Sequence, residues 1–209
     1  AGSRNSFYIK SDGSLWATGR NDYGQLGNGN ENDRTTFQKV VNSGVTAITA
    51  GSHSLYLKSD GSLWATGHNS GGQLGNGNTT SRTTFQKVVN SGVTAIAAGD
   101  TRSLYIKSNG SLWGMGYNSG GVLGDGTTTN RTSPVQIVDS NVTAINTMES
   151  NFSLFLKSDG SLWAMGNNGS GQFGARPGNN SYIPVSYLNL IRIIEQPYVA
   201  ETAADVTDN

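Results

Sequence analysis

A seven-residue stretch, Lys-Ser-Asp-Gly-Ser-Leu-Trp at Lys10 to Trp16, constrains the fold more than any other feature of the chain. It returns almost unchanged three more times, in copies that end at Trp64, Trp113 and Trp163. The period is therefore about 49 residues. Regular self-similarity at this spacing predicts one supersecondary unit that is repeated four times.

Each unit contains four runs of strand-like sequence. In the first unit they are residues 6–10, 15–19, 35–41 and 45–49, which are rich in β-branched and aromatic side chains. No segment carries an apolar pattern with a helical period. Four short strands per unit, with Trp and Gly at fixed places, are typical of a β-propeller blade. We therefore predict an all-β propeller of four-stranded antiparallel blades, with four repeats in this chain.

The first two strands of each unit flank an Asp-Gly or Asn-Gly dipeptide. This dipeptide between strands favours a hairpin with a two-residue type I′ turn. Such a turn fixes the register, and it predicts that Ile9 faces Trp16 and that Asn5 faces Arg20 at the open end.

Three segments of the third unit carry a family resemblance. Residues 98–104, 108–113 and 121–126 read Ala-Gly-Asp-Thr-Arg-Ser-Leu, Ser-Asn-Gly-Ser-Leu-Trp and Gly-Val-Leu-Gly-Asp-Gly. They resemble the repeat of the regulator of chromosome condensation family, and the resemblance covers essentially all of residues 1–194. It implies a propeller, typically seven-bladed, with known roles in guanine-nucleotide exchange on a small GTPase, light sensing and enzyme inhibition. The family therefore implies a binding scaffold with no single chemistry.

The repeats divide the chain into units at about 1–49, 50–97, 98–147 and 148–194, followed by a C-terminal tail at 195–209. The first unit lacks the Val-Thr-Ala-Ile strand that precedes the others, and residues 190–194 could supply it. Three arrangements stay open at this point. Further blades come from an upstream segment or another chain, the four blades close into a ring, or they form an open stack.

Charge and composition exclude several classes of function. The formal net charge is zero, so the chain lacks the basic footprint of a nucleic-acid binder. No apolar run approaches the roughly 20 residues of a membrane span. The absence of cysteine excludes disulfides and thiolate zinc sites. The composition, rich in Asn, Ser, Thr and Gly, leads us to expect a bacterial protein that is secreted or lies on the cell surface.

The candidate binding residues are those that differ between copies at the open ends of the hairpins. We expect them to share one rim of the propeller and to contact a protein partner, because Arg, Tyr, Phe and His are side chains that anchor interfaces. They are Arg20, His53, His68, Arg102, Tyr117 and Phe152. By contrast, side chains identical in all copies are interpreted as structural core, in particular Trp16, Trp64, Trp113 and Trp163.

The two histidines of the chain, His53 and His68, are predicted to face each other across one hairpin. Two ligands without a third do not define a metal site, so no metal and no cofactor are predicted. No catalytic residue is predicted either, because Asn109 replaces the turn aspartate in the third copy.

The function predicted from the sequence is a non-enzymatic protein-interaction scaffold that presents a rigid propeller face to a partner. Three alternatives stay open. One is a regulator of a small GTPase that resembles a guanine-nucleotide exchange factor. Another is a structural subunit that completes a larger assembly, by self-association or by completing a ring with another chain. The last is a glycan-binding propeller that uses the repeated Trp and Asn/Asp loops.

Overall fold

The computed structural model describes residues 2, 4–147, 151–173, 178 and 180–189. In this part of the chain fifteen strands form four antiparallel sheets, and one short 3-10 helix, η1 (Ser119–Gly121), lies in a loop. The sheets are, in chain order, β1 (Asn5–Ile9), β2 (Leu15–Gly19) and β3 (Arg34–Val41); β4 (Val45–Ala50), β5 (His53–Lys58), β6 (Leu63–Gly67) and β7 (Arg82–Val89); β8 (Val93–Ala98), β9 (Arg102–Lys107), β10 (Leu112–Gly116) and β11 (Arg131–Val138); β12 (Val142–Thr147), β13 (Phe152–Lys157), β14 (Ser161–Gly166) and β15 (Ser181–Asn189).

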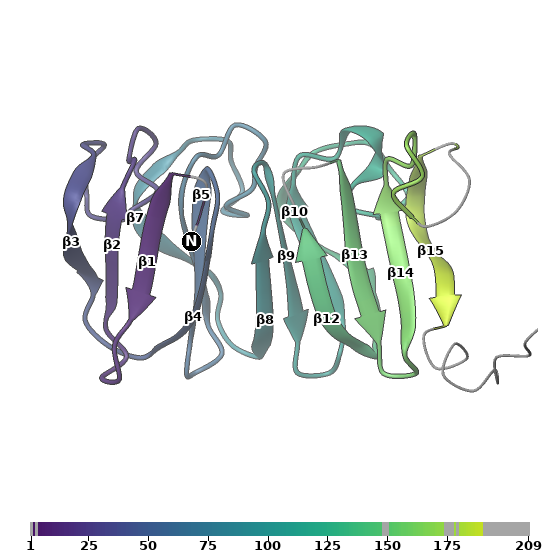
Figure 1. The fold of residues 1–209 in the computed structure, drawn as a ribbon, viewed down its shortest axis with the longest axis horizontal. Helices are drawn as coiled ribbons and strands as arrows, with labels where there is room; N and C mark the ends of the chain where they lie inside the picture. The colour runs from purple at the N-terminus through teal and green to yellow at the C-terminus, as the bar shows by residue number, and fades with distance from the viewer. Residues whose placement is uncertain (1, 3, 148–150, 174–177, 179, 190–209) are drawn as a thin grey trace, which may run out of the picture.

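The four sheets stand side by side in chain order, so the first and the fourth lie at opposite ends of the molecule (Figure 1). The prediction of an all-β fold with four-stranded antiparallel blades is confirmed, and the observed strands of the first unit agree with the predicted ones to within one residue. The described sheets do not close into a four-bladed ring. No helix in the described ranges has the length and apolar character that a membrane crossing requires.

The strand that ends each sequence unit belongs to the sheet of the next unit. For example, β4 pairs with β5, with Ile48 opposite Tyr56. The first sheet therefore has only three strands in the described part of the chain, as the absence of a Val-Thr-Ala-Ile strand before it predicted. Residues 190–194, which the sequence indicated as one possible source of this strand, and the tail 195–209 lie outside the described residues.

The predicted type I′ turn is wrong, and the hairpin register shifts with it. Ile9 pairs with Leu15 and Asn5 with Gly19, whereas a two-residue turn would place Asn5 opposite Arg20. The N–H of Gly13 donates to the carbonyl of Lys10 at 2.9 Å and the N–H of Lys10 to the carbonyl of Ser14 at 3.0 Å, so the turn holds three residues.

The Asp12 carboxylate explains the turn type, because its Oδ1 accepts a 2.9 Å hydrogen bond from the N–H of Ser14. Only Gly13, with a φ of 75°, takes the left-handed conformation, while Asp12 does not. This is a type I turn followed by a glycine bulge, the usual three-residue alternative to type I′.

The core lies between neighbouring sheets. The largest cluster joins Leu55, Leu63 and Leu74 of the second unit to Tyr105 and Met115 of the third. An equivalent cluster joins the third sheet to the fourth, and a smaller one joins the first to the second. Each sheet is too thin to bury both of its faces alone, so stacking supplies the burial.

The four tryptophans are partly buried and make the same contacts in every copy. Each indole stacks almost parallel on an aromatic ring of the adjacent strand, at centroid distances of 5.8 to 6.2 Å. Its Nε1 donates to the hydroxyl of the serine two residues earlier, at 2.7 to 3.0 Å. A lysine amine lies over each ring, at 4.2 to 5.4 Å from its centroid, within cation–π range.

Candidate protein-interaction surface

The long loops between the second and third strands of each unit share one internal organiser, a buried asparagine. In the first loop Oδ1 of Asn21 accepts from the N–H of Leu26 at 2.9 Å, while Nδ2 donates to the carbonyls of Asn30 at 2.7 Å and Asn32 at 3.1 Å. The equivalents repeat the contact to the buried apolar residue, at Asn69, Asn118 and Asn168. One amide thus satisfies backbone groups from both ends of a loop that has no regular structure of its own.

These loops are also clamped against neighbouring sheets. The apolar side chain at the equivalent position of each loop is buried, at Leu26, Leu74, Leu123 and Phe173. Gly24 has a φ of 75°, and a Cβ placed on it would lie 2.4 Å from the Cα of Thr83 in the next sheet. The loop backbone therefore approaches the next blade more closely than any other residue type allows.

The residue before each buried asparagine occupies one repeated backbone position with four different side chains. The N–H groups of Arg20, His68 and Tyr117 donate to the backbone carbonyl of the residue just before the first strand of the hairpin, at 2.9 to 3.1 Å, and Asn167 does so at 2.7 Å. None of the four side chains is buried, and Tyr117 is 38% exposed. We call these four residues the loop-edge residues.

Half of the predicted rim lies on this loop edge, namely Arg20, His68 and Tyr117. The expectation that the other half shares the exposed rim is wrong for His53 and Arg102, whose exposed fractions are 0% and 1%. Phe152 is only partly buried, and its ring lies 6.4 Å from that of Phe173. The physical reason is the side-chain alternation along the strand, which directs His53 to the same side as Leu55.

Arg102 links the third sheet to the fourth. Its Nη2 donates to the carbonyl of Phe152 at 2.7 Å and its Nε to the hydroxyl of Ser153 at 3.2 Å. Burial lowers the pKa of the guanidinium to about 10, and the charge of Asp100 opposes this shift. A cation in this place fastens two blades together and is withdrawn from any partner.

His53 makes the corresponding link between the second and third sheets. Its Nε2 lies 2.7 Å from the hydroxyl of Ser103, which itself donates to the carbonyl of Gln73 at 2.7 Å. The imidazole Nε2 therefore carries the proton, and Nδ1 has no hydrogen-bond partner among the described residues. Burial of the ring lowers the pKa of His53 to about 3.

The predicted pairing of the two histidines is also wrong, because His53 pairs with Gly67 and not with His68. The His68 ring lies 4.5 Å from the ring of Tyr23, and its Nδ1 lies 3.0 Å from Nε2 of Gln73. The two imidazoles therefore have separate partners. Within the described ranges no group of three or more His, Cys, Asp or Glu residues could hold a metal ion.

Sequence reasoning missed two sets of structural residues. The buried loop asparagines are identical in all four copies, which was the available signal. The serines that follow His53 and its equivalents donate to loop carbonyls of the preceding unit, and they are Ser54, Ser103 and Ser153. Their signal was also identity between copies, since Ser6 occupies the same place in the first unit.

On the loop edge a small hollow, of about 30 Å³, lies between the first and second sheets. It is lined by Arg4, Asn5, Arg20, Tyr23, Gln25, Gly51 and Ser52. A volume of this size accommodates about one water molecule, well short of a small-molecule site.

Comparisons with known proteins agree with this geometry. The model described as regulator of chromosome condensation (RCC1) repeat matches residues 12–57, 60–106 and 109–147, which is more than half of the chain. A second model of the same description matches residues 45–73, 93–121 and 150–172. No curated protein matches the sequence at a significant level.

Solved structures show the fold. Human WBSCR16 aligns with a TM-score of 0.77 and 20% identity over 88% of this chain and 50% of its own. The complex of Kap60 with yeast RCC1 (Prp20) aligns with a TM-score of 0.79 and 18% identity over 91% and 48%. Prp20p from Saccharomyces cerevisiae gives 0.77 and 18% over 91% and 50%. The chain thus spans about half the length of the solved chains it resembles, and at these identities the likeness concerns the fold alone.

Proposed function

Because this chain belongs to the regulator of chromosome condensation (RCC1) repeat family, we propose that it is a non-enzymatic scaffold whose loop edge binds a protein partner. Members of one fold family differ in chemistry, so the proposal depends on the site and not on the fold. The composition adds the further proposal that the chain acts outside a bacterial cell or on its surface.

One observation carries the proposal. The loop-edge residues share the same backbone hydrogen bond, yet they present a guanidinium, an imidazole, a phenol and an amide at Arg20, His68, Tyr117 and Asn167. The asparagine that follows each of them is buried and identical in every copy. An invariant framework that displays different interface-type side chains is the arrangement expected of a recognition surface.

The rigidity of the loops supports the same conclusion. Binding is weakened by the conformational entropy that loops and side chains lose when they become ordered. Here the loops are held in place by the buried asparagines and by close contact with the next sheet at positions such as Gly24. A partner that docks on Tyr117, or on Tyr23 beside His68, therefore meets a preorganised surface, because these tyrosines are 38% and 39% exposed on loops that are already ordered.

The structural neighbours bind proteins. Yeast RCC1 (Prp20) was solved bound to Kap60, and Prp20p was studied for its binding to Gsp1p and histones. The present chain spans about half of those proteins, so its own partner is proposed only as a protein of unidentified class.

The experiment is capture of partners from an extract of the source cells with the full chain as bait. The test variant combines Arg20→Ala, His68→Ala and Tyr117→Ala. The control combines Ser11→Ala, Ser59→Ala and Ser108→Ala, which lie on exposed turns at the other ends of the hairpins. A protein retained by the wild type and the control, but lost with the test variant, supports the loop edge as its binding site.

Equal recovery with the test variant would refute the loop-edge assignment. Accelerated release of guanine nucleotide from a small GTPase, measured with the wild-type chain, would instead favour the exchange-factor alternative. Circular dichroism of all three proteins checks that the fold is kept.

A further inference from the structure

Each pair of neighbouring sheets meets through two different faces. The second sheet contributes an aliphatic face with Leu55, Leu57 and Leu63, and the third sheet covers it with Tyr105 and Trp113. We call these the leucine face and the aromatic face. The third and fourth sheets repeat the contact through Leu104, Ile106 and Leu112 against Phe155 and Trp163. The first and second sheets repeat it through Leu15 against Tyr56 and Trp64.

The aromatic face of the first sheet has no sheet against it in the described part of the chain. Tyr8 is 36% exposed there, whereas its equivalents Tyr56 and Tyr105 are 3% and 1% exposed. Tyr8 stacks on Trp16 and meets Phe37 edge to face at 4.8 Å, as Tyr56 does with its own neighbours. Phe37 is 44% exposed. The aromatic side chains of β1, β2 and β3 are therefore arranged as in the packed sheets, and no described residue of another sheet covers them.

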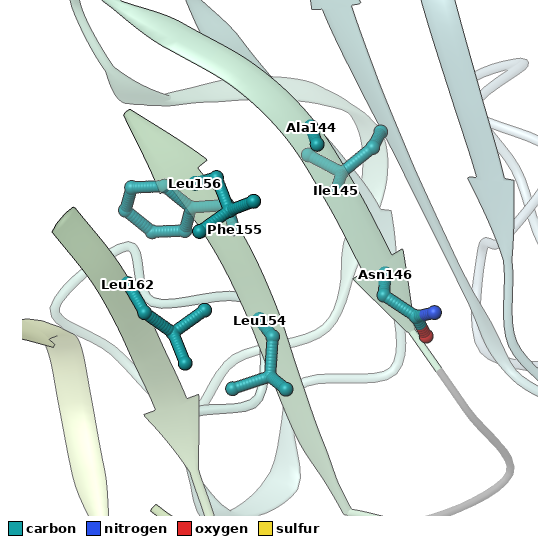
Figure 2. A pocket seen from close by; sticks show the side chains of 7 residues that line it. All are labelled: Ala144, Ile145, Asn146, Leu154, Phe155, Leu156 and Leu162. Atoms are coloured by element: carbon teal, nitrogen blue, oxygen red, sulfur yellow. The ribbon is translucent and has the colours of Figure 1, made fainter. Parts of the chain in front are cut away.

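The leucine face of the fourth sheet is uncovered in the same way. Leu154, Leu156 and Leu162 are only partly buried, although their equivalents Leu55 and Leu63 are completely buried. Together with Ala144, Ile145, Asn146 and Phe155 they line a cavity of about 270 Å³ across β12, β13 and β14 (Figure 2). Its lining is almost entirely apolar, which indicates an interaction site when such a patch is exposed.

We propose that the aromatic face of the first sheet docks on the leucine face of the fourth sheet in a second copy of this chain. The chain carries both halves of a contact that it already makes three times within itself. The lysines beside the tryptophan do not oppose the contact, because Lys10 lies over Trp16 in the same way as Lys58 lies over Trp64, where the sheets are packed.

The hydrogen bonds that join neighbouring sheets have no counterpart, among the described residues, on the aromatic face of the first sheet and the leucine face of the fourth. Ser54 and Ser103 donate to the carbonyls of Gln25 and Gln73 in the preceding loops, at 2.8 and 2.7 Å. Ser6 is the exposed equivalent in the first sheet, and Gln172 is the equivalent loop residue of the fourth unit. The docked pair places the hydroxyl of Ser6 against the carbonyl of Gln172 in the second copy.

The interface is heterologous, because different faces meet, and such contacts either close into a ring or continue as a filament. Two copies contain eight sheets, within the four to eight blades that propellers adopt. Each chain spans about half of the solved propeller chains it resembles, so a pair of chains contains about as many residues as one of those propellers. We therefore assign the closed pair of two chains as the assembly.

The test is the mass of the full chain by light scattering over a concentration series. Association into the pair gives twice the 22.0 kDa of the chain. Tyr8→Asp damages only the aromatic face, and Leu154→Asp damages only the leucine face. In a pair of identical variant chains, each of the two interfaces contains one damaged face. The loss of a central contact typically lowers the affinity about 30-fold per interface. Both variants are expected to be monomeric.

Mixing the two variants is the decisive step. The mixture restores one undamaged interface, between Tyr8 of the Leu154→Asp chain and Leu154 of the Tyr8→Asp chain, so a pair of unlike chains should form. Ser108→Asp adds the same charge on an exposed turn, and it should leave the wild-type pair intact. Urea unfolding checks that both variants are folded.

Two results would overturn the proposal. A wild-type chain that stays monomeric would show that something other than a second copy, such as further repeats or residues 190–209, covers these faces. A pair that survives Tyr8→Asp but not Leu154→Asp would instead show that two leucine faces meet each other.

Discussion

The buried histidine predicts a specific loss of stability in acid. His53 is completely buried, and burial lowers its pKa to about 3, whereas an unfolded histidine titrates near 6.5. Between these values the unfolded chain binds a proton that the folded chain does not. Stability therefore falls as the pH decreases through 6.5, and the loss continues until the pH reaches about 3.

The size of this effect follows from the two pKa values. Between pH 7 and pH 4.5 the contribution of His53 to the free energy of unfolding falls by about 2.5 kcal/mol. This figure barely changes if the folded pKa is one unit higher, because at pH 4.5 nearly all the difference arises from protonation of the unfolded state. It is a large fraction of the stability of a typical domain.

The matched variant is His53→Asn, since Asn5 occupies the same place in the first sheet and its Nδ2 donates across the sheet boundary to the carbonyl of Gly51 at 3.2 Å. Urea unfolding, followed by tryptophan fluorescence, gives the free energy of unfolding at pH 7 and pH 4.5. The wild type should lose about 2.5 kcal/mol more than the variant between these two pH values.

The control is His68→Asn, because His68 is only partly buried and its pKa is lowered by that partial burial. Its removal should change the pH dependence less than the removal of His53. The carboxylates of the turns also titrate, but Asp12, Asp60 and Asp159 are present in all the proteins and cancel in the comparison. Identical pH slopes in the wild type and His53→Asn would refute the buried, neutral state of this histidine.

Three further substitutions test the framework by the same unfolding assay. Asn69→Ala should cost about 2–4 kcal/mol, because it removes four hydrogen bonds inside its loop. A cost under 1 kcal/mol would contradict the role of this amide. Arg102→Ala should cost about 2–4 kcal/mol through lost bonds to the fourth sheet, and an unchanged midpoint would argue against that link. Gly24→Ala should cost clearly more than Gly29→Ala, for which about 1 kcal/mol of backbone strain is expected. Both glycines have positive φ, but only Gly24 has a neighbour, Thr83, in the path of a Cβ, so equal costs would exclude the close contact.

The sequence was sufficient for the fold because the repeats restate the same local information four times. Strand propensity, the glycines at the turns and the tryptophan spacing agree in every copy, and the observed strands of the first unit lie within one residue of the predicted ones. When local propensity, turn residues and repeat spacing all favour the same structure, the fold can be predicted from the sequence.

Only half of the candidate site residues were placed correctly from the sequence. A tight turn of three residues instead of two shifted the hairpin register, so the predicted partners across the open end were displaced by one residue. The alternation of side chains along β5 contained the missing signal, because His53 has the same parity as the core residues Leu55 and Leu57. The residue equivalent to His53 therefore points into the interface between two sheets. It differs between copies because each copy uses a different side chain to bond to the next sheet.

The sequence by itself determined the repeat and the positions of the strands, because these depend on contacts within about one unit. The tertiary structure decided which variable residues face solvent, since that depends on the stacking of one sheet on the next. It placed Arg102 and His53 between blades and left Tyr117 exposed. It also revealed the uncovered faces at Tyr8 and Leu154, because a repeated sequence gives each sheet the same two faces and only the stacking determines which of them are covered.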